Sequence, residues 1–340
     1  MINQVYRLIA PRQFSIEFSD ISLLSKNVIV RPQYLSICAA DQRYFQGMRD
    51  RLTLDAKLPM ALIHEAWGTV VHDGSGSFDR GSKVLLIPNT PCEKDSVIRE
   101  NYLASSRFRA SGFDGFMQEY VEMSPDRVIP FDGIKDDVAA LSEIMSVAMH
   151  SVSTMMELSH SRRDVIGVWG DGNVGYLVAL SIKLLMPKSK LVVFGRMKQK
   201  LSFFSFADSV YDVNDITGSD TIPVDHAFEC VGGGGSEYAI DQAIDFINPE
   251  GTITLMGVSE NNVPIRTRMI LEKGLRLIGR SRSGREDFIK VAGCLADREL
   301  QSLVSKIIRE VVTVRDISDV AAAFEEDSHQ PFKTVMKWEI

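Results

Sequence analysis

The sequence predicts an α/β protein built from two domains. A chain of 340 residues is too long for a single domain with one simple core, because single domains typically contain about 100–200 residues. Residues 1 to about 135 consist of short β-rich runs broken by turns, whereas strands alternate with helices from Asp137 onward. Such alternation is typical of a doubly wound parallel sheet, which is covered by helices on both faces.

Short strands separated by turns make up the N-terminal part. Val28–Pro32, Gly68–Val71 and Lys83–Pro88 are rich in β-branched and aliphatic residues, which favour strands. Asp73–Gly81 is rich in glycine, serine and aspartate and predicts a turn. Residues 93–115 are polar and basic, and we expect them to form a long loop or lobe.

The second half carries the alternating pattern. Its predicted elements are a helix at Val138–Leu158, strands at Asp164–Gly170, Lys190–Gly195, His226–Gly232, Thr252–Gly257 and Leu275–Gly279, and helices at Asn173–Met186 and Ser236–Ile247. Residues from about 290 to 340 are mixed in character. We expect this last segment to pack back on the N-terminal part.

A glycine-rich loop, Gly170-Asp-Gly-Asn-Val-Gly175, joins the first of these strands to the helix that follows. In a dinucleotide-binding loop the first glycine permits a tight turn, the second lets the backbone approach a pyrophosphate, and the third lets helix and strand pack closely. Gly170, Gly172 and Gly175 fit these positions. Asn173 and Val174 open the helix, whose free N–H groups favour an anion. An ordinary strand-to-helix turn is the alternative interpretation.

The end of the next strand indicates which dinucleotide binds. NAD sites usually place an Asp or Glu about 20 residues after the loop, where it holds the ribose hydroxyls. Here Gly195 is followed by Arg196, Met197 and Lys198, with Lys200 nearby, so cations replace the carboxylate. The sequence therefore predicts NADP(H), whose 2′-phosphate Arg196 and Lys198 would attract. Solvated loop charges are the alternative interpretation.

Four side chains upstream of the loop are candidate metal ligands: Cys38, His64, Glu65 and Glu143. Their spacing alone does not identify a metal site. Cys38 could be a small buried hydrophobe, and His64 and Glu65 could form a hydrogen-bonded pair. A carboxylate such as Glu143, inside an apolar helix, requires a partner. His150 lies seven residues further on the same helix and is better explained by a hydrogen bond in the core.

Four segments resemble motifs of the zinc-containing medium-chain dehydrogenases/reductases. Ser36–Asp41 is similar to their G-I-C-G-[ST]-D segment, and Ile63–Val70 to their G-H-E-x-x-G-x-V segment. Asp114–Val121 resembles G-G-F-A-E-Y-V. Ser142–His150 resembles the E-P-L-x-V-x-x-H segment of the polyol-dehydrogenase branch, whose Glu is a zinc ligand. The motifs occur in family order and cover nearly the whole chain.

This resemblance implies the fold and the ligand set. It implies a GroES-like, partly open β-barrel catalytic domain at residues 1–145, completed by about 290–340, and an NADP-binding Rossmann domain at residues 146–289. Cys38, His64 and Glu143 match the zinc ligands of the family. Glu65 matches a residue that ligates zinc directly or exchanges with its water. An edge-to-edge homodimer of Rossmann sheets is common in the family and is expected here.

The chain departs from the family pattern at several positions. Many relatives hold a structural zinc on four closely spaced cysteines, but only Cys92 falls in that stretch, so we expect one catalytic zinc and no structural zinc. The hydroxyl that often relays a proton is replaced by Ala40, and a frequent histidine is replaced by Arg43. The proton would then reach the product through zinc-bound water or Glu65. Ile63 stands where the family has glycine.

Over its whole length the sequence is similar to the ribulose-5-phosphate reductases of the TarJ type. Segments carrying this similarity include Val168–Tyr176, His226–Gly233 and Gly279–Gly284. The resemblance implies NADPH-dependent reduction of D-ribulose 5-phosphate to D-ribitol 5-phosphate, beside a ribitol-5-phosphate cytidylyltransferase, for CDP-ribitol in teichoic acid or capsule synthesis. One alternative is a zinc polyol or alcohol dehydrogenase with an unphosphorylated substrate. The other is a non-catalytic NADP(H)-binding redox sensor.

A phosphorylated ketose requires a cation at the site. Arg43, beside the metal motif, is the first candidate for binding the phosphate. Arg49 and Lys57 are weaker candidates, and Arg107 or Arg109 of the polar segment stay possible. A solvated surface charge is at least as good an interpretation for each of these except Arg43.

Composition narrows the class further. The net charge of −7 argues against broad nucleic-acid binding, which requires a basic surface. The four cysteines are widely scattered and form no disulfide framework, which fits a reducing cytoplasm. The N-terminus shows no signal-peptide pattern and no apolar run is long enough to span a bilayer, so we expect a cytoplasmic protein.

Overall fold

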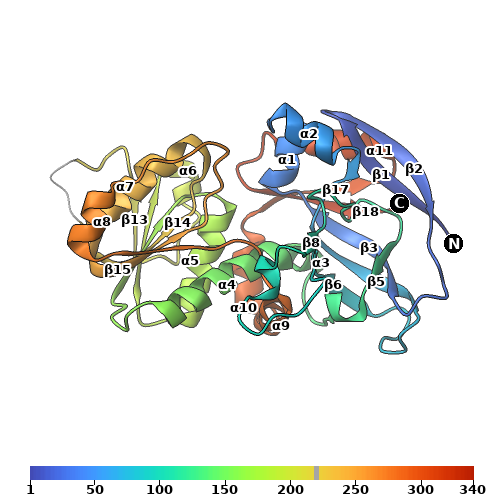
Figure 1. The fold of residues 1–340 in the computed structure, drawn as a ribbon, viewed down its shortest axis with the longest axis horizontal. Helices are drawn as coiled ribbons and strands as arrows, with labels where there is room; N and C mark the ends of the chain where they lie inside the picture. Colours follow the sequence, from blue (N-terminus) through green and yellow to red (C-terminus); the bar gives the residue numbers. More distant parts are fainter. Residues whose placement is uncertain (218–221) are drawn as a thin grey trace. The chain divides into compact units, whose positions relative to one another are not determined.

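The chain folds into two compact units. The computed structural model describes residues 1–217 and 222–340. The first unit comprises Met1–Ser146 together with Arg282–Ile340, and the second comprises Val147–Ser281 (Figure 1). The sequence placed the return to the first unit at about residue 290. In the structure it comes earlier, because the helix at Arg285–Cys294 already belongs to the first unit.

The first unit is built on mainly antiparallel sheets. Its largest sheet has the order β10-β6-β5-β3-β18-β17, with β9 also paired to β3. These strands are β3 (Val28–Ser36), β5 (Glu65–Asp73), β6 (Lys83–Leu86), β9 (Val121–Met123), β10 (Val128–Pro130), β17 (Ile308–Val314) and β18 (Lys333–Trp338). Smaller sheets are formed by β1 (Ile2–Ala10), β2 (Gln13–Asp20) and β4 (Met60–Ala61), and by β7 (Asn89–Thr90) and β8 (Arg107–Phe108).

The C-terminal segment completes the largest sheet of the first unit. β18 pairs antiparallel with β3, with Val335 opposite Ser36 and Lys337 opposite Tyr34. In Figure 1 the red C-terminal strands run beside the blue β3. This pairing places β18 next to the strand that leads into Cys38, so the end of the chain lies beside the candidate metal ligands.

Helices connect and cover the strands of the first unit. They are α1 (Ala39–Phe45), α2 (Arg51–Lys57), α3 (Asp136–Ala139), α9 (Arg285–Cys294), α10 (Arg298–Ser305) and α11 (Ile317–Asp327), with short 3-10 turns at Glu100–Tyr102 and Pro125–Arg127. The single helix predicted at Val138–Leu158 is instead two. α4 (Ser142–Leu158) begins after a break at residues 140–141, which puts Glu143 in its first turn.

The second unit is a doubly wound parallel sheet with the order β13-β12-β11-β14-β15-β16. Its elements are β11 (Val165–Trp169), α5 (Asn173–Leu185), β12 (Lys190–Gly195), α6 (Lys198–Leu201), β13 (Ser209–Asp212), β14 (Val224–Glu229), a 3-10 turn at Gly233–Gly235, α7 (Ser236–Phe246), β15 (Ile247–Leu255), α8 (Thr267–Lys273) and β16 (Arg276–Gly279). The strand order reverses at β11, so β12 and β14 flank it. Ligands of such sheets bind beyond the carboxyl ends of these strands.

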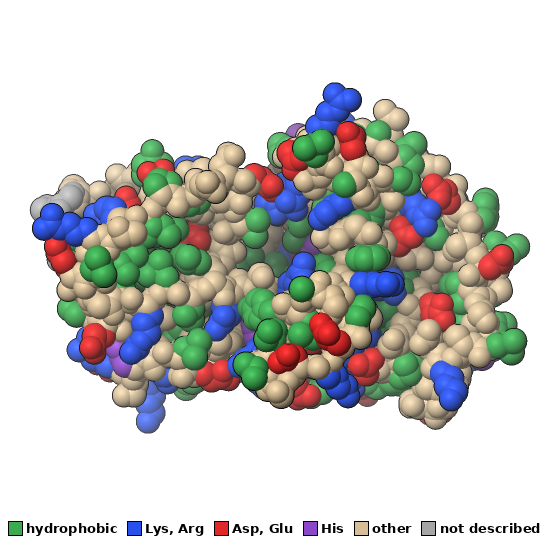
Figure 2. All heavy atoms as spheres, viewed as in Figure 1, with side chains coloured by type: hydrophobic (Ala, Val, Ile, Leu, Met, Phe, Trp, Pro, Cys, Tyr) green, Lys and Arg blue, Asp and Glu red, His purple; other side chains and the backbone are tan. Residues whose placement is uncertain are grey.

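Burial explains why the central strands could be recognised. β11 and β14 are almost fully buried, as expected when helices cover both faces of a parallel sheet, and β11 is also apolar. β13 was not predicted, because its residues are only partly buried and it lies at the edge of the sheet. Both signs of charge are interspersed on the face shown in Figure 2. Within the described residues no helix has the length and apolar character needed to cross a membrane.

Candidate active site

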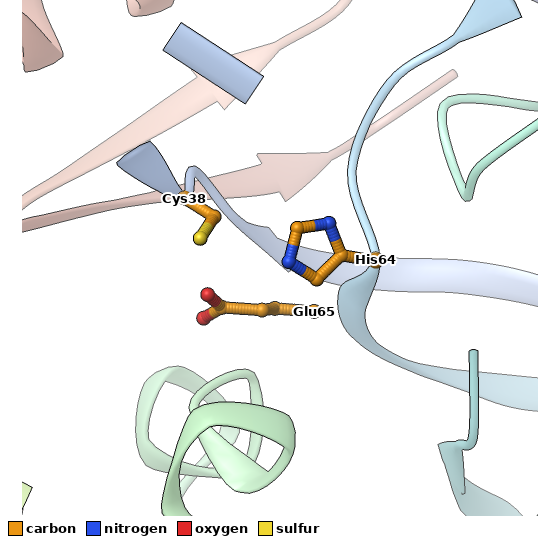
Figure 3. Close-up of side chains that lie close together, drawn as sticks. All are labelled: Cys38, His64 and Glu65. Carbon is orange, nitrogen blue, oxygen red and sulfur yellow. The ribbon is translucent and has the colours of Figure 1, made fainter. Parts of the chain in front are cut away.

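Three predicted ligands meet in the first unit. Cys38 precedes α1, whereas His64 and Glu65 lie at the start of β5. One donor atom from each residue lies within 4.8 Å of the other two, and the side chains converge in Figure 3. Sulfur, nitrogen and oxygen donors in this combination suit zinc. The structure thus brings Cys38 close to two adjacent residues that lie 26 and 27 positions further along the sequence.

Two buried polar atoms in this cluster have no hydrogen-bond partner among the described residues. Oε2 of Glu65 and Nδ1 of His64 are buried and accept or donate no hydrogen bond within the described part of the chain. Buried carboxylate oxygens almost always have a partner, so Glu65 Oε2 indicates room for a cation or a water molecule. The donor set and these open atoms together fit a zinc ion.

Asp41 connects the two segments that carry the ligands. Its Oδ2 accepts a hydrogen bond from the backbone N–H of Cys38 at 3.1 Å, and its Oδ1 accepts one from the N–H of Ile63 at 3.1 Å. Oδ1 also lies 3.7 Å from Nδ1 of His64, which is an ion-pair rather than a hydrogen-bond distance. Although burial opposes protonation, Asp41 and Cys38 raise the pKa of His64. The sequence analysis did not select Asp41.

The backbone at Ile63 explains the glycine that the family prefers there. Ile63 has a φ of 70°, in the left-handed region that glycine adopts easily and β-branched residues rarely do. It is nevertheless fully buried, and its N–H and C=O are bonded to Asp41 and Phe116. These contacts hold Ile63 in a strained backbone conformation directly before His64. Such a conformation costs about 1–3 kcal/mol.

Lys333 of β18 is a further charged group that the sequence analysis missed. Its Nζ donates to Oε1 of Glu65 at 2.6 Å and to the carbonyl of Ile37 at 2.9 Å. Both Lys333 and Glu65 are fully buried. Burial disfavours the ammonium, but the charges of Glu65 and Cys38 raise the pKa of Lys333. Lys333 therefore fixes one oxygen of Glu65 and leaves the other directed to the cluster.

Glu143 does not belong to the three residues whose donor atoms lie within 4.8 Å of one another. It is nevertheless close enough to interact electrostatically with this cluster. It is buried in the first turn of α4, where the helix dipole favours a carboxylate. Burial raises its pKa to about 7, and the positive charges of His64 and Lys333 oppose that shift. Its role as a ligand stays a prediction. His150 is buried in the part of α4 that belongs to the second unit.

The predicted phosphate ligands have different environments. Arg109 is half-buried and donates to the carbonyls of Asp114 and Glu122, and desolvation lowers its pKa to about 10. Its guanidinium is therefore committed to holding the loop. Lys57 donates to Ser111, and Arg49 stacks on Tyr44 and Arg107 on Phe113. Arg43 lies in the last turn of α1, five residues after Cys38.

A second candidate site lies in the other unit, beyond the carboxyl ends of β11, β12 and β14. It is a cavity of about 770 Å³, lined by Gly170, Asp171 and Gly172 of the glycine loop, by Gly195, Arg196, Met197 and Lys200 after β12, and by further residues including Val213, Asn214, Cys230, Gly232 and Tyr238. Its volume and position fit a dinucleotide at the switch point of the sheet.

Two glycines of the loop have the predicted roles. Gly170 has a φ of +128°, and a side chain there would begin 2.9 Å from the backbone carbon of Cys230. A side chain at Gly175 would begin 2.0 Å from the carbonyl oxygen of Gly170, so helix and loop could not approach. Gly172 lines the cavity and faces open space. Asn173 and Val174 start α5 beside it.

Carboxylates that the sequence analysis did not select shape this cavity. Oδ2 of Asp171 accepts hydrogen bonds from the backbone N–H groups of Arg196 and Met197, both at 2.8 Å. The buried Glu229 accepts from the N–H groups of Gly232 and Gly257. These bonds fix the turns after β12, β14 and β15.

The two predicted cations after β12 differ in position. Arg196 lines the cavity and is exposed, whereas Lys198 is absent from the lining. The ammonium of Lys198 lies 3.2 Å from the carboxylate of Asp215, and its side chain is 75% exposed. Lys200 does line the cavity. The cofactor-binding role of Lys198 stays a prediction that the geometry favours less than that of Arg196.

Known proteins resemble this chain over its full length, and two family models match parts of it. Residues 25–133 match the alcohol dehydrogenase GroES-like domain, and residues 208–297 match the zinc-binding dehydrogenase domain. The ribulose-5-phosphate reductase of Bacillus spizizenii is 49% identical over 100% of both chains. The ribulose-5-phosphate reductase 1 of Staphylococcus aureus is 49% identical over 99% of both, and the enzyme of Streptococcus pneumoniae is 43% identical.

Solved structures give the same result. The crystal structure of S. aureus TarJ in complex with NADPH matches all of both chains with a TM-score of 0.89 and 43% identity. L-idonate 5-dehydrogenase from Escherichia coli matches with a TM-score of 0.87 at 19% identity, a likeness of fold alone. These findings confirm the predicted fold class, a GroES-like domain joined to a Rossmann domain, and the family resemblance.

Proposed function

The chain belongs to the ribulose-5-phosphate reductases, within the family of zinc-binding dehydrogenases, and from this premise we propose that it reduces D-ribulose 5-phosphate to D-ribitol 5-phosphate with NADPH. One observation carries the proposal. The chain, which is similar to these enzymes over its full length, contains both a Cys–His–Glu cluster and a cavity that fits a dinucleotide. Basic residues that follow β12 line this cavity. The proposed product would supply CDP-ribitol for teichoic acid or capsule synthesis.

The preference for NADPH rests on the turn after β12. Gly195 ends the strand, and Arg196 replaces the carboxylate that would hold the ribose hydroxyls of NAD. Asp171 fixes the backbone of this turn, so the side chain of Arg196 extends from a backbone atom of defined position. A 2′-phosphate would meet the guanidinium of Arg196 and the ammonium of Lys200, both in the cavity lining.

The chain's own residues prepare the first site for zinc. Cys38, His64 and Glu65 would hold the ion, with Glu143 as a further ligand. When bound, zinc would polarise the C2 carbonyl as a Lewis acid, and NADPH would supply the hydride. Asp41 and Lys333 orient the ligand segments, because each bonds to residues that carry or flank the donors. Such fixed supporting contacts keep the ligands in place.

Proton delivery follows a different route from the usual one. Ala40 has no hydroxyl to relay a proton, so the carboxylate of Glu65 is the protein group proposed for this role. Within residues 1–217 and 222–340 its Oε2 has no hydrogen-bond partner, whereas Oε1 is held by Lys333. Arg43 is proposed to attract the phosphate of the substrate.

Other parts of the proposal concern the whole molecule. We propose one zinc per chain, a homodimer joined through the edges of the parallel sheets, and association with a ribitol-5-phosphate cytidylyltransferase in the cytoplasm. All four cysteines are thiols, which is consistent with a reducing compartment. β13 and β16 are the outer strands of the parallel sheet and are therefore the edges available for such pairing.

The reaction itself can be measured directly. We expect the zinc-loaded protein to oxidise NADPH rapidly with D-ribulose 5-phosphate, and slowly when D-ribulose or NADH is substituted. The measurement is the decrease of nicotinamide absorbance, with D-ribitol 5-phosphate identified as the product. Equal turnover of D-ribulose and D-ribulose 5-phosphate would instead support a polyol dehydrogenase. No turnover with a zinc-loaded, NADPH-binding protein would reject the proposed substrate.

A further inference from the structure

We propose that Arg282, immediately before α9, binds the phosphate group of the sugar substrate. The inference rests on the proposed function and names a group that binds its substrate. Arg282 lies in the first unit with the candidate zinc ligands.

An aromatic ring connects Arg282 to the cluster. The guanidinium carbon of Arg282 lies 4.7 Å from the ring centre of Phe108, and that ring lies 5.5 Å from the imidazole of His64. The guanidinium therefore lies no more than about 10 Å from His64. In a five-carbon sugar, a phosphate on C5 is roughly 6 Å from C2, by ordinary bond lengths. A ketose with its carbonyl at the cluster could thus extend its phosphate toward Arg282.

The backbone around Arg282 is held on both sides. Ser283 shares a buried hydrogen bond of 2.6 Å with Ser146, whose hydroxyl also lies 2.6 Å from the carbonyl of Glu143. On the other side, the N–H of Arg285 donates to Glu100 at 2.7 Å. Arg282 itself has a φ of 58°, in the left-handed region. Strained residues that their surroundings hold in place occur preferentially at ligand sites.

In the part of the chain that the structure describes, no carboxylate pairs with Arg282. Over residues 1–217 and 222–340 its guanidinium forms no ion pair and no hydrogen bond, in contrast to Arg127, which pairs with Glu100 and Asp126. Its side chain is half-buried. Burial lowers its pKa, and the carboxylate of Glu143 opposes that shift. A half-buried guanidinium on an aromatic ring offers a planar set of donors to a phosphate.

Two substitutions test the assignment. Arg282→Gly removes the side chain at a φ that glycine adopts without strain, so the fold is preserved. Arg282→Lys keeps the charge but not the planar fork. We expect kcat/KM for D-ribulose 5-phosphate to fall roughly 10- to 100-fold in Arg282→Gly, mainly through KM, and to recover in part in Arg282→Lys. The value for D-ribulose should fall far less.

Arg12 provides a matched control. It also has a left-handed backbone, with φ 61°, and stacks on a phenylalanine, Phe45, but its guanidinium is paired with Glu325. Arg12→Gly should leave the preference for the phosphorylated sugar at the wild-type value. A second readout is inhibition by inorganic phosphate, which should weaken by a similar factor in Arg282→Gly and not in Arg12→Gly.

The outcomes separate this inference from the proposed function. An unchanged KM in Arg282→Gly, or equal losses with D-ribulose and D-ribulose 5-phosphate, would overturn the assignment of Arg282. If the wild-type protein does not reduce D-ribulose 5-phosphate, the proposed function fails. Calorimetric binding of inorganic phosphate to the wild-type protein and Arg282→Gly would then decide the role of Arg282 alone, and equal affinities would reject it.

Discussion

The proposed selection of NADPH by Arg196 depends on a backbone position that another residue, Asp171, fixes. The side chain lines the nucleotide cavity, while Asp171 of the glycine loop accepts hydrogen bonds from the N–H groups of residues 196 and 197. The loop that would hold the pyrophosphate and the turn that would hold the 2′-phosphate are therefore connected through one carboxylate. Gly195 is small for the same reason, since a side chain there would begin 2.7 Å from Asp171.

The substitution Arg196→Asp should change the choice of nucleotide. We expect affinity for NADPH to fall roughly 10- to 100-fold, because a charged hydrogen bond is lost and a like charge is introduced. Affinity for NADH should change much less. Calorimetric titration of both nucleotides measures this. Lys198→Asp is the comparison, and its effect should be smaller, because Lys198 is paired with Asp215 outside the cavity lining. Equal losses for NADPH and NADH in Arg196→Asp would contradict the assignment.

β18 shows how one element can complete a site whose ligands lie far away in the sequence. Lys333, at the start of β18, lies in the interior, whereas Lys337, near the end of the strand, is partly exposed. Lys333 meets the buried Glu65, whereas Lys337 pairs with the partly exposed Glu339. The two lysines therefore form ion pairs of the same chemistry in opposite environments, and their energetic contributions should differ.

Lys333→Met should destabilise the first unit strongly. Removal of the ammonium leaves Glu65 buried without a counter-charge, which typically costs about 3–5 kcal/mol. Lys337→Met, on the same strand, should cost at most about 1 kcal/mol, because exposed pairs contribute little. Urea unfolding measures the free energy of unfolding of both variants. The metal is first removed with a chelator, because a bound zinc ion would compensate the charge of Glu65. Similar losses for the two variants would contradict this account of Lys333.

At the scale of the whole molecule, the chain stabilises its polar lobe without the usual cysteines. In the part of the sequence where relatives hold a structural zinc, only Cys92 occurs, and it is exposed. The lobe is held by the buried Arg127, which donates to Glu100 at 2.9 Å, and by Arg285, whose N–H donates to the same carboxylate. We propose that this ionic network takes the place of a second metal in the polar lobe.

The metal content of the purified protein should therefore be one zinc per chain. We expect Cys38→Ser to remove most of the bound zinc and Cys92→Ser to remove none, because only Cys38 belongs to the donor cluster. Elemental analysis of dialysed protein measures the content, and the thermal midpoint confirms that each variant is folded. Two zinc ions per chain, or loss of zinc in Cys92→Ser, would contradict a single site.

The amino-acid sequence determined the features that neighbouring residues specify together. Apolar runs predicted buried strands of the parallel sheet, and the glycine spacing predicted the nucleotide loop. The short motifs around Cys38 and His64 predicted three side chains that the structure brings together. Edges and breaks were missed, such as β13 and the gap before α4, because marginal burial and a short interruption leave little pattern in the sequence.

Only the tertiary structure decided which distant groups complete the sites. Lys333 meets Glu65 across 268 positions, because β18 pairs with β3. Arg282 reaches the neighbourhood of His64 through Phe108, and Asp41 bonds to the backbone of Ile63. An isolated lysine, arginine or aspartate looks the same in a sequence whether it is solvated or buried. Its partner is chosen by strand pairing and packing, which no local pattern encodes.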